Sequence, residues 1–194
     1  MPSRDSPIVS AFPVEVAVRQ IYSQHRNLAK VLLAVERQLV VVDAGEEMPD
    51  LLPAAGLMKY LREFHHRNHQ AAEDQYLFTA MRQRDAPREL FAAAMNDHGL
   101  ADYKVGALEA ALADWLGDPA MPEPLLPALL ADYGALKRNH MALEESVVLP
   151  AAVEILPATD WEAIAAVFRG HVDPLFDCEP SAELMPLHQL LKAA

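Results

Sequence analysis

Two copies of the pattern His-x-x-x-Glu, each preceded by a further histidine, are the residues of this chain best suited to chemistry. In chain order the two sets are His25, His69 and Glu73, then His98, His140 and Glu144. The interval from the lone histidine to the pair is 44 residues in the first set and 42 in the second. Imidazole and carboxylate groups together suit iron, manganese or zinc, whereas purely oxygen donors suit magnesium or calcium. The sequence therefore predicts a metal site.

The repetition supports this interpretation more strongly than the short motif does. With 8 histidines in 194 residues, an isolated His-x-x-x-Glu match arises readily by chance. Here residues 69–80 and 140–151 also align without gaps and share a histidine, an alanine, a glutamate and then a second acid. The period is too long for a solenoid repeat. We infer that one helical hairpin with three potential ligands is duplicated.

Four long helices are the elements that must position these residues. The stretches in which apolar residues recur at helical spacing are residues 14–42, 51–84, 87–116 and 125–149. Short connections between them favour an all-α fold, an up-down-up-down four-helix bundle over residues 13–156. The stripes expected to face the core include Tyr76, Leu136 and Val147.

Prolines and capping residues predict where the helices begin and end. Pro87 is expected in the first turn of the third helix, and Pro150 at a kink or stop of the fourth. Residues 1–12 are predicted to be a flexible N-terminus. Residues 157–194 are predicted to be a short helical and irregular extension, in which residues 159–160 cap one short helix.

Helix geometry places the six residues in two half-sites. Residues four apart on an α-helix lie on the same face one turn apart, so each His-x-x-x-Glu pair points in one direction. The lone histidines can reach the same depth from antiparallel neighbours. We assign two ions, one to His25 and His69 and the other to His98 and His140, with Glu73 and Glu144 bridging. An oxo or hydroxo group is expected to complete the bridge.

Composition excludes several classes of partner. The net charge of −12 argues against nucleic acid and against an anionic membrane surface, because both need clustered Lys and Arg. No stretch approaches the run of about 18 apolar residues that a transmembrane helix needs, and the N-terminus lacks the pattern of a signal peptide. Cys178 is the single cysteine, so no internal disulfide is possible. We therefore expect a cytoplasmic protein.

The two sets and their surroundings resemble the hemerythrin-like family, which carries His-His-Glu cation-binding modules. The resemblance lies in residues 24–28, 69–78, 97–99 and 140–150. It covers about residues 14–156, and residues 160–161 and 173–176 are similar to an extension of some bacterial members. It implies a non-haem di-iron centre inside a four-helix bundle. Members are linked to dioxygen binding, oxygen or redox sensing, nitric oxide response and repair of iron centres.

One departure from the family pattern bears on function. Oxygen-carrying members have a fifth histidine one turn from the ligand on the third helix, and the corresponding positions here are Ala94 and Asp102. Fewer protein ligands leave room for water or an exogenous molecule, which favours reactivity over storage of dioxygen. Asp102 is either a replacement ligand, a partner of a ligand histidine, or a solvated acid.

Other polar residues near the motifs receive structural interpretations. Asp74 and Glu145 follow the ligand acids by one position and so point about 100° away, which indicates salt bridges or surface solvation. His65 is interpreted as the cap of a core pocket, with a seventh ligand or an outer hydrogen-bond partner as the alternatives. His171 and His188 are expected to be exposed.

Three functional hypotheses follow from these residues. The first is a di-iron protein that binds or reacts with dioxygen, nitric oxide or a related oxidant, in sensing, stress response or repair of iron centres. The second is a helical interaction module whose histidines bind zinc or no metal. The third is an oxidase- or peroxidase-like enzyme that uses the open iron position. The expected partner is a small diatomic ligand or oxidant, and the sequence indicates no particular protein partner.

Overall fold

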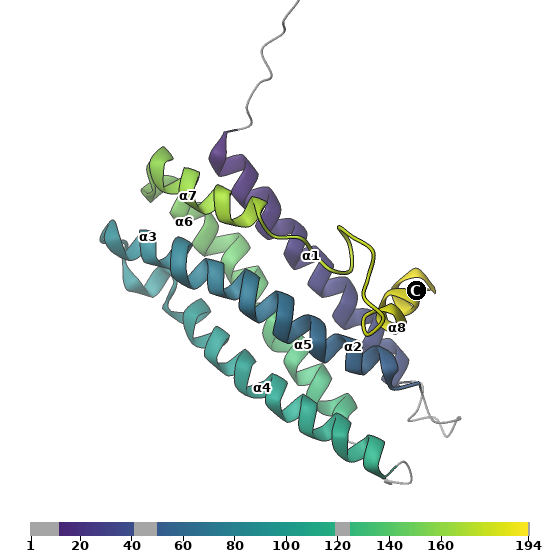
Figure 1. Cartoon of the computed structure of the whole chain (residues 1–194). Helices are drawn as coiled ribbons and strands as arrows, with labels where there is room; N and C mark the ends of the chain where they lie inside the picture. The colour runs from purple at the N-terminus through teal and green to yellow at the C-terminus, as the bar shows by residue number, and fades with distance from the viewer. Residues whose placement is uncertain (1–11, 41–49, 119–124, 194) are drawn as a thin grey trace, which may run out of the picture.

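A computed structural model describes residues 12–40, 50–118 and 125–193 of the chain (Figure 1). These residues form helices joined by turns and loops, without a strand, which confirms the all-α prediction. The N-terminus that we predicted to be flexible lies outside the described residues, apart from Phe12. Within the described ranges, no helix is both long and apolar enough to cross a bilayer.

Four long helical segments are followed by two C-terminal helices. The first segment is α1 (Pro13–Val40), and the second joins α2 (Leu52–Tyr60), η2 (Leu61–Gln70), η3 (Glu73–Leu77) and α3 (Phe78–Gln83). The third consists of the short turn η4 (Arg88–Leu90) and α4 (Ala92–Gly117), and the fourth joins α5 (Leu125–Leu143), η5 (Glu144–Val148) and α6 (Leu149–Ile155). The C-terminal helices are α7 (Ala158–Arg169) and α8 (Met185–Ala193).

The long segments lie side by side, and the chain reverses direction from each segment to the next (Figure 1). The first and third segments both pack along α5, and α2 packs against α1 and α4. This arrangement is consistent with the predicted bundle. It allows side chains from all four segments to meet at one depth.

Two hydrophobic clusters fill the interior, one on each side of the predicted ligands along the helices. On α1, Ile21 belongs to one cluster and Leu28 to the other, and His25 lies between them. On α4, Ala94 and Ala101 are divided in the same way around His98. The ligand residues therefore form a buried polar layer between two apolar layers.

π-Helical turns change which residues face the core after the two glutamates. We predicted Tyr76 and Val147 to be buried, but they are 40% and 39% exposed, whereas Leu77 and Val148 are fully buried. Residues 73–77 and 144–148 are π-helical, with hydrogen bonds that span one residue more than in an α-helix. The extra residue turns the following side chains out of the α-helical register. The prediction was wrong at both positions for this one reason.

Two proline positions also differ from the predictions. Pro87 has an extended backbone (ψ 123°) and precedes η4, and α4 begins only at Ala92, so Pro87 is not in the first turn of the α-helix. Of the two outcomes predicted for Pro150, the stop is wrong, because the fourth segment continues as α6 to Ile155, and the kink stays a prediction. The π-helical turn directly before Pro150 removes the usual α-helical hydrogen-bond pattern, into which a proline ring does not fit.

The C-terminal extension is docked on the bundle. α7 packs along α1, and α8 packs against α2, where Gly56 meets Leu187. The N-cap of α7 is Pro157, so our assignment of residues 159–160 as the cap was wrong. Asp173 is buried, and accepts hydrogen bonds from Tyr60 and Asn27 at 3.0 Å each.

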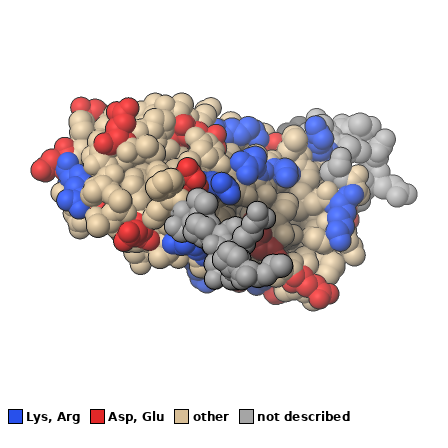
Figure 2. Space-filling view, turned by 90° about the horizontal axis from the view of Figure 1, so that it is seen from above, with Lys and Arg blue, Asp and Glu red and all other residues tan. Residues whose placement is uncertain are grey.

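The surface carries charges of both signs. Figure 2 shows acidic and basic side chains on one face of the molecule, with uncharged residues between them. Across the described surface, ion pairs join different segments, such as Arg84 Nε with Asp160 Oδ2 at 2.8 Å and Arg138 Nη1 with Glu36 Oε1 at 3.1 Å. Some of the acidic side chains that give the chain its net charge of −12 are thus paired with nearby arginines.

Candidate metal centre

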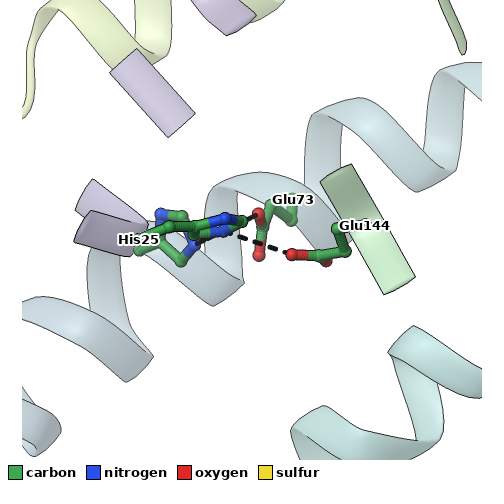
Figure 3. A group of neighbouring side chains, drawn as sticks. His25, Glu73 and Glu144 are labelled. Atoms are coloured by element: carbon green, nitrogen blue, oxygen red, sulfur yellow. Dashed lines mark hydrogen bonds and ion pairs between the residues drawn. The ribbon is translucent and has the colours of Figure 1, made fainter. Parts of the chain in front are cut away.

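The structure brings the six predicted ligand residues together in the polar layer. They are His25 in α1, His69 in η2, Glu73 at the start of η3, His98 in α4, His140 in α5 and Glu144 at the start of η5. All six are buried, the most exposed being His98 at 6%. Figure 3 shows the ring of His25 directed toward the carboxylates of Glu73 and Glu144.

The ligand atoms form two groups that share both glutamates. One group is His25, His69, Glu73 and Glu144, and the other is His98, His140, Glu73 and Glu144. Within each group the atoms lie within 4.8 Å of one another. The two groups match the two half-sites expected from the repeat, with each carboxylate placed where it can contact both.

Nε2 of each histidine faces the centre. In each half the two Nε2 atoms are 3.2 Å apart, between His25 and His69 and between His98 and His140. Glu73 Oε1 lies 3.1 Å from His69 Nε2, and its Oε2 lies 3.4 Å from His98 Nε2. A single carboxylate therefore approaches one histidine of each half.

Hydrogen bonds at Nδ1 hold the rings of His25, His69 and His98 in this orientation. His25 Nδ1 donates to Glu145 Oε1 at 2.9 Å, and His98 Nδ1 donates to Asp74 Oδ1 at 3.0 Å. A proton on Nδ1 leaves the Nε2 lone pair free to bind a metal, and a carboxylate partner makes the imidazole a stronger ligand. We expected salt bridges or surface solvation for both acids, and each is partly exposed and forms an ion pair, but the partner in each case is a predicted ligand histidine, which the sequence analysis did not indicate.

The outer partners repeat with the duplication. Each acid that follows a ligand glutamate contacts the lone histidine of the other set: Asp74 contacts His98, and Glu145 contacts His25. The residue before each lone histidine faces the paired histidine of its own set. Gln24 Oε1 accepts from His69 Nδ1 at 2.7 Å, and Asp97 Oδ2 lies 3.7 Å from His140 Nδ1. The sequence signal for the acids was the Glu-acid dipeptide that both copies share.

Electrostatics within the layer favour the protonated forms of His25 and His98 in the absence of metal. Burial lowers the pKa of His98, but hydrogen bonds to Asp74 and Glu73 raise it, and the resulting pKa is about 9. Burial also acts to lower the pKa of His25, but hydrogen bonds to Glu144 and to two further carboxylates raise it well above the ordinary value. A bound metal ion would therefore replace protons at these rings.

The same contacts keep the glutamates ionised. Burial and the charge of Glu73 act to raise the pKa of Glu144, but hydrogen bonds from His140 and His25 lower it to about 2. All four carboxylate oxygens of the two glutamates are buried, and Glu144 Oε2 lies 3.3 Å from Nε2 of both His25 and His140. Buried anionic oxygens need nearby positive charge, which protonated imidazoles or a bound metal ion can supply. The donor set thus fits metal ions.

Lys137 in α5 is a buried cation that the sequence analysis did not identify. Its side chain is 1% exposed, and its Nζ has no hydrogen-bond partner among the described residues. Burial lowers the pKa of the amine to about 8, while the charges of Glu144, Glu73 and Asp97 raise it. The interior of the bundle therefore contains a third kind of titratable group beside the histidines and glutamates.

The spacing along α5 could have located this lysine. Lys137 follows Tyr133 by four residues and precedes His140 by three, and both of these neighbours are fully buried. Helical periodicity places Lys137 on the same face. We had assigned Leu136 to that face instead, and it is only half-buried.

The remaining candidates lie outside the two groups. Asp102 is exposed, and accepts from Arg62 Nη1 at 2.6 Å and contacts His66 Nδ1 at 3.2 Å, so it is neither a replacement ligand nor a partner of a ligand histidine. His65 is fully buried but belongs to neither group, and its Nδ1 lies 3.3 Å from Gln70 Oε1. Its ring packs against the ring of His69 at 4.8 Å between centroids, and its role as the cap of a core pocket stays a prediction.

The C-terminal extension reaches the outer part of the centre. His171 is half-buried, and its Nδ1 lies 3.3 Å from Gln24 Nε2. The oxygen of the same Gln24 amide accepts the hydrogen bond from His69 Nδ1. The ring of Phe168 in α7 packs against the ring of His69 at 6.0 Å. The expectation that His171 is exposed was therefore wrong. His188 is likewise half-buried, and its Nδ1 donates to the Leu175 carbonyl.

Comparison with known proteins adds one finding to this geometry. The family model described as hemerythrin HHE cation binding domain matches residues 16–152. No curated protein and no solved structure matches the chain. The matched range contains all six residues of the two groups and ends before α7.

Proposed function

The chain belongs to the hemerythrin HHE cation-binding family, and from this premise we propose that its buried cluster holds two non-haem iron ions. One ion would be held by His25 and His69 and the other by His98 and His140, with Glu73 and Glu144 between them. The sharing of both carboxylates by the two groups supports this proposal, because bridging anions offset the repulsion between adjacent cations. Imidazole with carboxylate is a donor set that suits iron.

The same proposal includes the architecture around the ions. We propose that residues 13–156 form an up-down-up-down four-helix bundle of the hemerythrin type, with residues 157–194 as an extension that covers one side of the centre. The side-by-side packing of the four segments supports the first part. The contact of Phe168 with His69 supports the second.

We further propose that the centre binds or reacts with dioxygen, nitric oxide or a related oxidant, in cytoplasmic sensing, stress response or repair of iron centres. Six protein side chains shared between two ions leave coordination positions for a small molecule. Ala94, at one of the positions considered for a fifth histidine, is fully buried among apolar residues and offers no ligand atom. This supports a reactive centre more than a storage protein.

Metal analysis of the protein expressed with added iron tests this proposal. We expect about two irons per chain, near-ultraviolet charge-transfer absorption, and loss of iron as the pH falls toward about 5, because protons then compete for the ligands. Zinc in place of iron would support the interaction-module hypothesis instead. Iron-free protein would contradict the proposal. Steady turnover of peroxide would favour the enzymatic hypothesis.

A histidine variant tests the ligand assignment itself. His140→Ala should remove at least one iron per chain while circular dichroism shows the helix content largely unchanged. His188→Ala is the matched control, because His188 lies in α8 outside both groups. Equal iron content in the two variants would refute the assignment.

A further inference from the structure

The two halves of the polar layer differ in the group that faces the paired histidine. In the second half this group is the carboxylate of Asp97, whose Oδ2 lies 3.7 Å from His140 Nδ1. In the first half it is the amide of Gln24, whose Oε1 accepts a hydrogen bond from His69 Nδ1 at 2.7 Å. A carboxylate offers an acceptor in either orientation, but an amide offers an acceptor at one end and donors at the other. The first half therefore depends on which way the Gln24 amide is turned.

Metal binding through His69 needs the amide orientation that the structure shows. A histidine that binds a metal through Nε2 carries its proton on Nδ1, and that proton needs an acceptor. His69 and Gln24 are both buried, so the acceptor must come from the protein. A reversed amide would turn its NH2 group toward the Nδ1 proton and leave two buried donors facing each other, which is costly.

His171 distinguishes the two orientations of this amide. Its Nδ1 lies 3.3 Å from Gln24 Nε2, which is a donor only, so the imidazole nitrogen is the acceptor of this hydrogen bond. The bond satisfies the NH2 end of the amide and leaves the oxygen toward His69. The three side chains thus form a continuous hydrogen-bonded chain from the C-terminal extension to a predicted ligand.

The ring of His171 is held firmly enough to orient its partner. It lies between the rings of Phe168 and Phe64, at centroid distances of 5.1 and 6.4 Å. Two residues further along, the buried carboxylate of Asp173 accepts hydrogen bonds from side chains of α1 and α2, at 3.0 Å each. The backbone on one side of His171 is therefore fixed by α7, and on the other side by Asp173.

We propose that His171 is a positioning residue of the metal centre, which orients the Gln24 amide so that His69 binds its ion through Nε2. The C-terminal extension then supports one half of the centre only, because Asp97 in the other half needs no orientation. The family match ends at residue 152, so this support comes from outside the matched domain. The inference rests on the proposed iron centre and adds the part that the extension plays in it.

A double-mutant cycle between His171 and Gln24 tests this proposal. Iron(II), added anaerobically in competition with a chromophoric chelator, gives a dissociation constant for each binding step. His171→Phe keeps a ring in place and removes the acceptor. We expect it to weaken one step about three- to tenfold and to leave the other within about twofold. Complete loss of an outer partner typically costs about 10–100-fold, whereas here the amide remains and is only free to turn.

The second arm of the cycle separates orientation from packing. In a Gln24→Glu background, His171→Phe should change neither step by more than about twofold, because a carboxylate has no wrong orientation. Gln24→Leu, which has no amide to orient, is a second background with the same expectation. A merely structural role of His171 would instead weaken binding equally in every background. His188→Phe is the matched control, since His188 is a half-buried histidine of the same extension outside both groups.

The possible results separate the inference from the proposed centre. Wild-type protein that binds no iron would overturn the centre, and the inference with it. Normal iron binding by the wild type together with unchanged affinities in His171→Phe would overturn the inference alone. Equal weakening of both steps, or the same loss in the Gln24→Glu background, would also overturn it. If circular dichroism shows that His171→Phe is unfolded, His171→Leu is measured in its place with the same expected results.

Discussion

Replacing Asp74 by asparagine is expected to weaken metal binding in one half of the centre. The Asp74 carboxylate accepts the Nδ1 proton of His98 at 3.0 Å and so holds Nε2 of that ring 3.2 Å from His140 Nε2. A hydrogen bond to a charged partner contributes about 1.5–3 kcal/mol and one between neutral groups about 0.5–1.5 kcal/mol. The Asp74 side chain is 41% exposed, so solvent screens part of the difference. About 1 kcal/mol remains, which corresponds to roughly fivefold in affinity.

Competition with a chromophoric chelator measures this effect for each ion. Asp74→Asn should weaken only one of the two binding steps, because Asp74 contacts one histidine of one group. Asp102→Asn is the control, since Asp102 is an exposed acid of the same size that contacts no ligand residue. Glu145→Gln should weaken the other step through His25. Identical dissociation constants for the Asp74 and Asp102 variants would show that the outer carboxylate does not support the ligand.

Three further predictions concern the pH dependence of metal affinity, the register of the π-helical turns and the packing of α8 on α2. Metal affinity should rise between pH 7 and 9, because His98 has a pKa of about 9 and must lose its proton to bind metal; an affinity independent of pH would contradict this assignment. Leu77→Ala should lower the free energy of unfolding by about 2–5 kcal/mol, and Tyr76→Ala by only about 0.5 kcal/mol. Urea denaturation measures both changes, and a larger loss for Tyr76→Ala would exclude the π-helical register. Gly56→Ala should lower the free energy of unfolding by about 1 kcal/mol net, because the added Cβ would lie 3.0 Å from Leu187 Cβ. The steric cost of about 1–3 kcal/mol is partly offset by the higher helix propensity of alanine. A more stable Gly56→Ala variant in the same denaturation experiment would show that α8 does not pack closely there.

The ligand set could be predicted from the sequence because it depends on local helix geometry and on the repeat. His69 and Glu73 are one turn apart, so their common direction follows from the helix alone. The repeat then supplied the second pair and both lone histidines. The structure places all six in one buried layer, in two groups that share both glutamates.

The surroundings of the ligands depend on how the segments are rotated against one another, which the sequence does not encode locally. Asp74 and Glu145 point away from their own helix's ligand face, yet reach the lone histidine on a neighbouring segment. The π-helical turns place Tyr76 and Val147 on the outer side. The residues of these two turns contain no pattern from which a π-helix could be predicted. Lys137 was missed because a lysine at a core position contradicts the apolar pattern used to find the core.

The paired π-helical turns restrict how this chain can gain or lose residues. Each turn contains its extra residue directly between a glutamate of the polar layer and the first side chains of the next apolar layer, over residues 73–77 and 144–148. Deleting one residue from either window would restore α-helical bonding but rotate everything downstream by about 100° relative to the glutamate. Either the polar layer or the adjacent apolar layer would then lose its alignment. The length of these two windows is therefore as strict a requirement of the site as the identity of its ligands.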